Sequence, residues 1–286
     1  MSLPRAIQVL LVPLVLCATT GGCASKSPKL QREWLAALSG DAEVRPGVKL
    51  PDRQAIQNKR EARDYLVSTL TRIGLKAERQ SYGTDSENIY AVLTCGRPSA
   101  EAVVVGAHYD TVRGAPGAND DGSGVAAVLA VAREMTRHKP RTRDLMFVLF
   151  DEEERGLLGS RSFAQMLKDQ NRPIHSVHTI DQVGWDSNHN RAIELEIPYE
   201  GAEALYAEAA KRLKLVIPIY VTPETGSDHV SFRRQGFKAV GITEEYRHKD
   251  TTPFIYKPGD TFQTIDFDYL TSTTRLLVEV MRTLTR

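Results

Sequence analysis

Cysteine is scarce in this sequence, which limits how the chain can be cross-linked. Its three cysteines are Cys17, Cys23 and Cys95. We expect the first two to belong to an N-terminal export segment, so that Cys95 would be the only thiol of the folded part. No intramolecular disulfide is therefore expected. Stability must come from a packed core, for which 286 residues with 41% hydrophobic content suffice.

An excess of charge of one sign is also missing. The 37 basic and 36 acidic residues are interspersed and give a formal net charge of +1. A nucleic-acid-binding protein normally presents a basic face, and no run of lysine and arginine occurs here. We therefore expect no nucleic-acid partner.

A hydrophobic run long enough to cross a membrane is absent too. The apolar stretch from Ile7 to Leu16 follows Arg5 and is too short to span a bilayer. Such a stretch is typical of a secretory signal, and the small residues before Cys23 resemble a bacterial lipoprotein cleavage site. We expect residues 1–22 to be a signal peptide and Cys23 to carry a lipid that anchors an exported protein, in the periplasm or at the cell surface. Ordinary cleavage and secretion is the alternative.

Internal repeats and long low-complexity segments are likewise absent, and strand and helix patterns alternate along the chain. Residues 23–52 suggest a tether and a short helix near residues 30–38, and residues 53–286 suggest one folded domain. The alternation favours a single α/β domain with a mostly parallel central sheet flanked by helices. We expect strands near residues 76–82, 88–94, 103–107, 144–150, 177–180, 215–219 and 238–242, and helices near residues 53–73, 122–138, 199–213 and from 267, with another ending near 168.

One stretch, residues 103–126, combines a strand, a polar loop and the start of a helix. Three valines form a short apolar strand of the kind that is buried on both faces. His108 and Asp110 follow where this strand ends, and Asp120 lies just before the expected helix. In open α/β sheets, ligands bind at the carboxyl ends of the strands. We therefore interpret this stretch as half of a metal site.

Further acidic residues follow two other strands. Four consecutive acids, residues 151–154, come directly after the strand at 144–150, and Asp181 follows the strand at 177–180. A charge run is often only a solvated surface, but four acids at the end of a buried strand repel one another and need a compensating cation. Imidazole and carboxylate groups are ligands for zinc and similar cations. The residues expected to converge at this edge are His108, Asp120, Glu153, Glu154 and Asp181.

Six motifs support this interpretation. GAHYDT, PGANDDGSG, EEERGLLGS, IDQVG, SDHVSF and PGDT occur in this order, and the set resembles the di-zinc aminopeptidase family typified by the bacterial leucyl aminopeptidases, in metallopeptidase clan MH. The resemblance extends from Arg53 to the C-terminus. It implies the zinc exopeptidase fold, also described as phosphorylase/hydrolase-like, with residues 53–286 as the catalytic domain and two zinc ions as cofactors.

The resemblance also implies roles for individual residues. His108 and Asp181 would bind one zinc, Glu154 the other, and Asp120 would bridge both. Glu153 would be the general base, although the sequence alone leaves open an exchange of roles between Glu153 and Glu154. A cis peptide would join Asp120 to Asp121. The residues that would lie beside the ligands without binding metal are Asp110, which would orient the ring of His108, and Asp121, Asp228, His229 and Asp260.

Two metal ions suit this chemistry. Coordination lowers the pKa of water from 15.7 toward about 7, and two ions about 3.5–4 Å apart polarise a peptide carbonyl together. Glu153 is next to a ligand without being needed as one, so it can move the proton of the water to the leaving amine. The same ligand types also admit cobalt or manganese.

The sequence departs from the family at the last ligand. In the segment Pro253 to Thr261, counting back from Asp260 places Tyr256 where the family has a histidine. Three hypotheses remain open. Tyr256 binds the second zinc as a phenolate, which a nearby cation favours; or His248 or His229 substitutes; or this zinc is weak or missing.

Three functions follow from these hypotheses. The first is a metal-dependent aminopeptidase that acts on the N-terminal residues of peptides, with carboxylates such as Glu153 and Asp120 near the free amine. The second keeps the fold and changes the reaction to glutaminyl cyclisation or to another amidohydrolase reaction, since function resides in the site. The third is a catalytically impaired binding lipoprotein, motivated by Tyr256. The sequence predicts no oligomeric state and no residue preference.

Overall fold

The structure is a computed structural model that describes residues 27–98 and 100–286. The expected signal peptide and the expected lipid attachment at Cys23 lie outside these residues. Within the described part of the chain, no helix combines the length and the apolar character needed to cross a bilayer. Cys95 is a free thiol and half-buried.

Eight strands form one mixed sheet in the order β1-β2-β4-β3-β5-β8-β6-β7. The pairs β3–β4, β3–β5, β5–β8 and β6–β7 are parallel, and the other three pairs are antiparallel. The expected α/β domain with a mostly parallel sheet is thus confirmed. The strands are β1 (Ala77–Gly83), β2 (Ser86–Leu93), β3 (Ala102–His108), β4 (Asp144–Phe150), β5 (Ile174–Ile180), β6 (Ile193–Glu196), β7 (Ile219–Thr222) and β8 (Ala239–Thr243).

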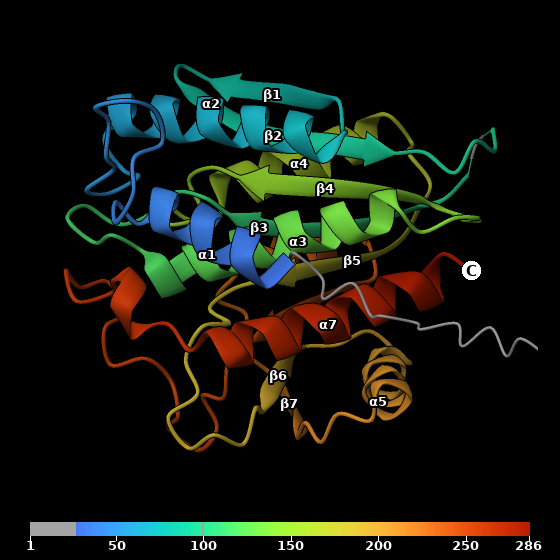
Figure 1. The fold of residues 1–286 in the computed structure, drawn as a ribbon. Coiled ribbons are helices and arrows are strands. Elements are labelled where there is room, and N and C mark those ends of the chain that lie inside the picture. Colours follow the sequence, from blue (N-terminus) through green and yellow to red (C-terminus); the bar gives the residue numbers. More distant parts are fainter. Residues whose placement is uncertain (1–26, 99) are drawn as a thin grey trace, which may run out of the picture.

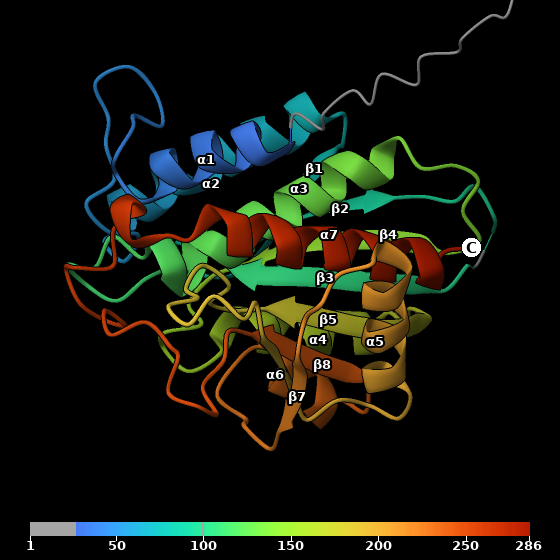
Figure 2. The same ribbon diagram turned by 60° about the horizontal axis from the view of Figure 1, so that its bottom comes forward.

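Helices cover both faces of the sheet (Figures 1 and 2). The larger core lies under α1, α2, α3, α5 and α7, and a smaller core, with Phe163 and Phe232, lies under α4 and α6. Strands β3 and β4 are buried throughout because both faces are covered. The helices are α1 (Ser27–Leu38), α2 (Ile56–Ile73), α3 (Gly124–Thr136), α4 (Leu158–Asp169), α5 (Ala202–Leu213), α6 (His229–Arg234) and α7 (Phe267–Leu284), with the helical turns η1 (Ala118–Ser123) and η2 (Phe262–Thr264).

Most expected elements are present, and α2 ends at Gly74 in the left-handed conformation as predicted. The elements β6 and α6 were not expected, and several expected elements begin at other residues. The first helix begins at Ser27, inside the expected tether. The strand expected at 215–219 begins only at Ile219, because the apolar run before it contains Val216, which is 91% exposed and outside the sheet. The helix expected from residue 122 begins at Gly124, after the turn η1.

The parallel strands explain where the site lies. His108 at the end of β3 is in register with Phe150 at the end of β4, and Asp181 follows the last residue of β5. Since β3 lies between β4 and β5, the segments that leave these three strands meet at one edge of the sheet.

Candidate metal centre

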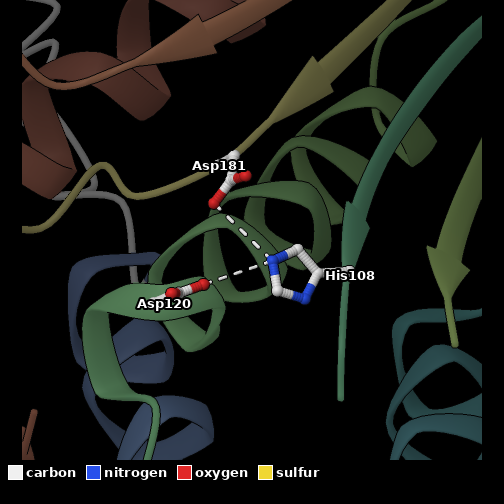
Figure 3. A group of neighbouring side chains, drawn as sticks. All are labelled: His108, Asp120 and Asp181. Carbon is white, nitrogen blue, oxygen red and sulfur yellow. Dashed lines mark ion pairs between the residues drawn. The ribbon is translucent and has the colours of Figure 1, made fainter. Parts of the chain in front are cut away.

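Three of the expected ligands form a compact group in this structure (Figure 3). His108 Nε2 lies 3.3 Å from Asp120 Oδ1 and 3.6 Å from Asp181 Oδ1. One ligand atom from each residue falls within 4.8 Å of the other two. The three side chains come from the end of β3, the turn η1 and the segment after β5, and they point toward one another.

One carboxylate connects this group with the loop after β4. Asp110 Oδ1 lies 3.4 Å from His108 Nδ1, on the side of the ring that faces away from Asp120 and Asp181. The same carboxylate accepts the backbone N–H groups of Glu153 and Glu154, at 3.0 and 3.3 Å. Asp110 therefore anchors the backbone of the two glutamates. It also lies where outer carboxylates orient metal-binding histidines, although His108 Nδ1 has no hydrogen-bond partner among the described residues.

Asp121 joins three segments at the same place. Its carboxylate accepts the backbone N–H groups of His108 at 3.2 Å, Gln182 at 3.2 Å and Gly124 at 2.9 Å. The peptide bond between Asp120 and Asp121 is cis, as the resemblance implied. Asp121 thus fixes the end of β3, the segment after β5 and the start of α3 relative to one another.

Asp260 positions Asp120 from the other side. Its two carboxylate oxygens accept the backbone N–H groups of Asn119 at 2.8 Å and of Asp120 at 3.0 Å. Burial raises the pKa of Asp260 to about 6, while these two hydrogen bonds lower it. The turn that presents Asp120 is therefore held by a carboxylate distant in the sequence.

The donor set and its spacing fit zinc. Ligand atoms about 2.0–2.2 Å from a tetrahedral zinc are about 3.3–3.6 Å apart, which matches the two distances from His108 Nε2. Asp120 Oδ2 and Asp181 Oδ1 are buried and receive no hydrogen bond from the described residues. Burial, with Asp181 and Asp110 adding like charge, raises the pKa of Asp120 although His108 opposes the shift. A cation would relieve this crowding of acids.

Glu153 and Glu154 lie beside this group rather than in it. Burial, followed by the charges of Asp228 and Asp181, raises the pKa of Glu153, with His108 opposing. Burial and the charge of Asp120 raise the pKa of Glu154 to about 8. Neither side chain belongs to the three-residue group. Both are nevertheless electrostatic neighbours of it.

The other two acids of the run after β4 have a protein cation. Lys59 Nζ of α2 lies 3.3 Å from Asp151 Oδ1 and 3.0 Å from Glu152 Oε1, and all three side chains are nearly buried. The compensating cation expected for residues 151–154 is therefore a lysine for the first two. Sequence reasoning missed Lys59, because nothing in a helix pattern indicates which lysine is buried.

Tyr256 lines the same cleft as Asp120, Glu153 and Asp181. Tyr256 is 57% exposed, and its backbone is in the left-handed conformation, with φ of 60°. Burial of the phenol and the charges of Glu154 and Asp120 raise the pKa of Tyr256. Tyr256, which stands where the family has a histidine, therefore interacts electrostatically with Glu154 and Asp120, the two acids expected to bind the second zinc.

The two alternative histidines have other neighbours. His248 Nδ1 pairs with the Glu245 carboxylate, and its ring lies edge-on to Tyr220. His229 is fully buried, with Nδ1 3.4 Å from Glu196 Oε2. Among the described residues, neither histidine joins the three-residue group.

Asp228 precedes His229 and is also buried. Burial raises the pKa of Asp228 to about 7, while the charge of His108 lowers it. Asp228 Oδ1 has no hydrogen-bond partner among the described residues. Asp228 thus adds a further acid to the surroundings of Glu153 and His108.

Arg53 is a second supporting residue that sequence reasoning missed. Its guanidinium is fully buried and donates to the backbone carbonyls of Leu38, Tyr109, Pro116 and Gly117. These bonds hold the loop that leads from His108 to Asp120. No sequence pattern distinguishes this arginine from the exposed ones.

A further group, Asp186, His189 and Asp266, also has ligand atoms within 4.8 Å of one another. Asp266 already accepts two backbone N–H groups at the start of α7, and the His189 side chain is 81% exposed. These residues do not line the cleft of about 550 Å³ that opens at Asp120, Glu153 and Asp181. We therefore place the candidate centre at His108, Asp120 and Asp181.

Comparisons with known proteins identify relatives of this chain. The chain is 28% identical over 223 residues to leucine aminopeptidase 1 of Paracoccidioides brasiliensis, covering 71% of this chain and 57% of the relative. The LapA aminopeptidase of Legionella pneumophila superposes with a TM-score of 0.80 at 21% identity, covering 91% of this chain and 72% of that chain. The zinc aminopeptidase BSAP of Bacillus subtilis gives 0.65 at 25% identity, with 70% and 50% covered.

A solved structure with another activity has the same fold. Porphyromonas gingivalis glutaminyl cyclase superposes with a TM-score of 0.72 at 18% identity, covering 90% of this chain and 98% of that chain. By contrast, the chain spans less than three fifths of the length of the Paracoccidioides relative. The profile of peptidase family M28 matches residues 88–281, which include all three residues of the candidate centre. This chain belongs to peptidase family M28.

Proposed function

We propose that this protein is a zinc-dependent aminopeptidase that hydrolyses the first peptide bond of peptides with a free N-terminus. The observation that carries the proposal is the convergence of His108, Asp120 and Asp181 at the head of a cleft, with Glu153 beside them. Membership of family M28 and the aminopeptidases among the relatives support the reaction class.

In this proposal, His108, Asp120 and Asp181 would hold one zinc, and Asp120 and Glu154 would contribute to holding a second. Bound zinc would supply Lewis-acid chemistry, which polarises a peptide carbonyl and acidifies water. Asp110 keeps the imidazole of His108 oriented through Nδ1. Asp260 keeps the turn of Asp120 in place through two backbone N–H groups.

Glu153 would act as the proton carrier. It lines the cleft and its backbone N–H is anchored on Asp110 at 3.0 Å. Zinc in the cluster would lower the pKa of Glu153, because a cation favours the ionised carboxylate. The ionised carboxylate would take a proton from water and deliver it to the nitrogen of the leaving group. The negative charge of the carboxylates near Asp120 would attract the free α-ammonium group of the substrate.

Tyr256 would complete the second zinc site as a phenolate. It lines the cleft near the acids that share this site, and zinc would reverse the upward shift of its pKa. When a tyrosine binds zinc as a phenolate, its ultraviolet absorption differs from that of the neutral phenol. Zinc titration of the wild type and of Tyr256→Phe, followed by ultraviolet difference spectroscopy, therefore tests the assignment. Absence of a phenolate signal at saturating zinc would remove Tyr256 from the ligand set.

The decisive experiment measures metal content and hydrolysis together. We expect purified protein to retain zinc, to release arylamine from aminoacyl arylamides, and to lose both after chelation. A protein that binds no zinc and leaves every aminoacyl arylamide intact contradicts the proposal. If instead Tyr256→His creates zinc binding or activity that the wild type lacks, the protein is the impaired binding lipoprotein.

Glutaminyl cyclisation is the second candidate. The observation in its favour is coverage. This chain covers 98% of the Porphyromonas cyclase but only 57% of the Paracoccidioides aminopeptidase, so its length is more similar to that of the cyclase. An 18% identity carries the fold alone, so the reaction must be measured. Glutaminyl arylamide distinguishes the two: an aminopeptidase releases glutamine and arylamine, whereas a cyclase converts the intact substrate to a pyroglutamyl arylamide.

Export and lipidation at Cys23 complete the proposal. Their support is the apolar stretch before small residues and Cys23. Mass spectrometry of the mature N-terminus tests them, since cleavage elsewhere or an unmodified Cys23 would exclude the lipid anchor.

A further inference from the structure

The cleft extends from the candidate metal centre over β6, β7 and β8. Its floor on β6 is formed by two acidic residues. Glu194 and Glu196 of β6 are two residues apart, so their side chains share one face of the strand. Both line the cleft, together with Thr222 of β7 and Thr243 of β8. Glu196 is in register with Gly241, where a Cβ would collide with Glu196 Oε2. Glycine at this position leaves room for the carboxylate.

These carboxylates are nearly buried and incompletely partnered. Glu194 is 1% exposed and accepts the backbone N–H of Arg247. Glu196 is 8% exposed, and its Oε2 receives no hydrogen bond from the described residues. His229 is nearest, at 3.4 Å. Burial lowers the pKa of His229 to about 4, so its ring is neutral near pH 7 and provides no countercharge.

The rest of the lining at this end adds one acid and one arginine. Glu224 lies at the exposed rim of the cleft. Burial, followed by the charges of Asp181 and Glu224, raises the pKa of Glu196 to about 8. Glu196 is therefore largely protonated near pH 7, and a cation bound beside it would favour its ionised form. Arg247 also lines the cleft, but its guanidinium lies 5.6 Å from the ring centroid of Tyr220. Burial raises the pKa of Glu194, and the backbone N–H and the charge of Arg247 oppose this shift.

We propose that Glu194 and Glu196 form a subsite for a cationic side chain, so that the enzyme prefers peptides with N-terminal lysine or arginine. The inference rests on the proposed aminopeptidase function, which places the first residue of the peptide in this cleft. With the α-amine and carbonyl at the cluster, a long basic side chain extends over β6 toward the two carboxylates. A leucine side chain would cover the Glu196 carboxyl group without giving Oε2 a partner, which is unfavourable for a buried polar group.

The first test compares lysine with its uncharged analogue. Lysyl and norleucyl p-nitroanilides differ chiefly in the terminal ammonium, so the ratio of their kcat/KM values isolates the charge. A hydrogen bond between charged groups is expected to favour the lysyl substrate on the order of tenfold or more. A ratio of one or less in the zinc-loaded wild type overturns the proposal.

The second test removes the charge while keeping the shape. In Glu194→Gln and Glu196→Gln the lysyl-to-norleucyl ratio should fall about tenfold, with thermal unfolding used to verify the fold. The matched control is Glu208→Gln, an exposed residue on α5, which should keep the wild-type ratio. Folded variants at both positions with an unchanged ratio would overturn the subsite.

A binding measurement separates this inference from the proposed function. Calorimetry with lysinamide and norleucinamide should show tighter binding of lysinamide to the zinc-loaded wild type, and loss of that difference in Glu196→Gln. If norleucyl substrate is cleaved and lysine has no advantage, the aminopeptidase proposal stands and the acidic subsite falls. If nothing is cleaved but lysinamide binds through Glu196, the subsite stands and the reaction is wrong. Equal binding overturns the subsite.

Discussion

The four acids of residues 151–154 divide into two pairs with different surroundings. Asp151 and Glu152 are buried against Lys59, which lies within 3.3 Å of both carboxylates. Glu153 and Glu154 face Asp110, Asp120 and Asp181 instead, and the pKa of each is raised. The first pair has its cation inside the protein, whereas the second pair requires one from outside. A charge run at a strand end is thus partly structural and partly functional.

The largest contrast within this run should appear in catalysis. We expect Glu153→Gln to lower kcat/KM by about 10²–10⁴-fold, the usual contribution of a general base, with zinc content retained. Glu152→Gln should lower stability while the folded enzyme still turns over. Aminoacyl arylamide kinetics and zinc analysis on both variants test this, and equal losses of activity would erase the distinction between the two pairs.

Replacing Lys59, the cation buried beside Asp151 and Glu152, should lower the stability of the fold. Lys59→Met removes the cation from Asp151, whereas Glu152 keeps its ion pair with Arg155. Breaking a buried ion pair in this way costs about 3–5 kcal/mol. Denaturant unfolding measures the loss. Lys76→Met is the control, because the Lys76 side chain is 88% exposed in its pair with Glu78, and it should leave the midpoint unchanged. A stable Lys59→Met would show that these two acids need no cation.

Supplying the external cation should stabilise the other pair. At a free zinc concentration 100 times Kd, zinc bound only to the folded state adds about 2.7 kcal/mol. We expect Asp120→Asn to lose most of this gain and Asp169→Asn, at the exposed end of α4, to keep it. Thermal or denaturant unfolding with and without zinc measures the gain, and an unfolding midpoint that ignores zinc in the wild type contradicts the centre.

The last effect is absent at neutral pH and concerns a buried base that forms no ion pair with the other described residues. His178 of β5 contacts Ser176 Oγ and Tyr206 Oη, and burial lowers its pKa to about 3. Its folded pKa is below the unfolded value near 6.5, so the unfolded state binds the proton first. Stability from this group is therefore present above pH 6.5 and is lost as pH falls toward 3, by about 1.4 kcal/mol per pH unit.

Replacing the histidine tests this slope. Between pH 6.5 and 4, the free energy of unfolding of His178→Gln should fall less steeply than that of the wild type. His189→Gln is the control, because that side chain is 81% exposed. Parallel curves for His178→Gln and wild type would show that the buried imidazole does not resist protonation.

Much of the candidate site could be predicted because chain order restricts it. His108 follows three valines and Asp181 follows a short segment rich in β-branched residues, and both patterns favour strands. The carboxyl ends of neighbouring parallel strands lie at one edge of the sheet. The boundary near Asp120 was less predictable. Helix α3 begins only at Gly124, since Asp121 uses its carboxylate to join His108, Gln182 and Gly124. No local pattern announces contacts between such distant segments.

The chemistry of the ligands and most of the order of the strands and helices follow from the sequence by itself, because hydrophobic periodicity and residue type are local properties. The short elements β6 and α6 were not expected. Only the tertiary structure decided which charges are neutralised. It buried Lys59 and Arg53 beside particular acids and carbonyls, and it placed Glu194 and Glu196 on the floor of the cleft. These outcomes depend on which surfaces come together. Electrostatic compensation is a property of distances in space, which separation along the chain does not determine.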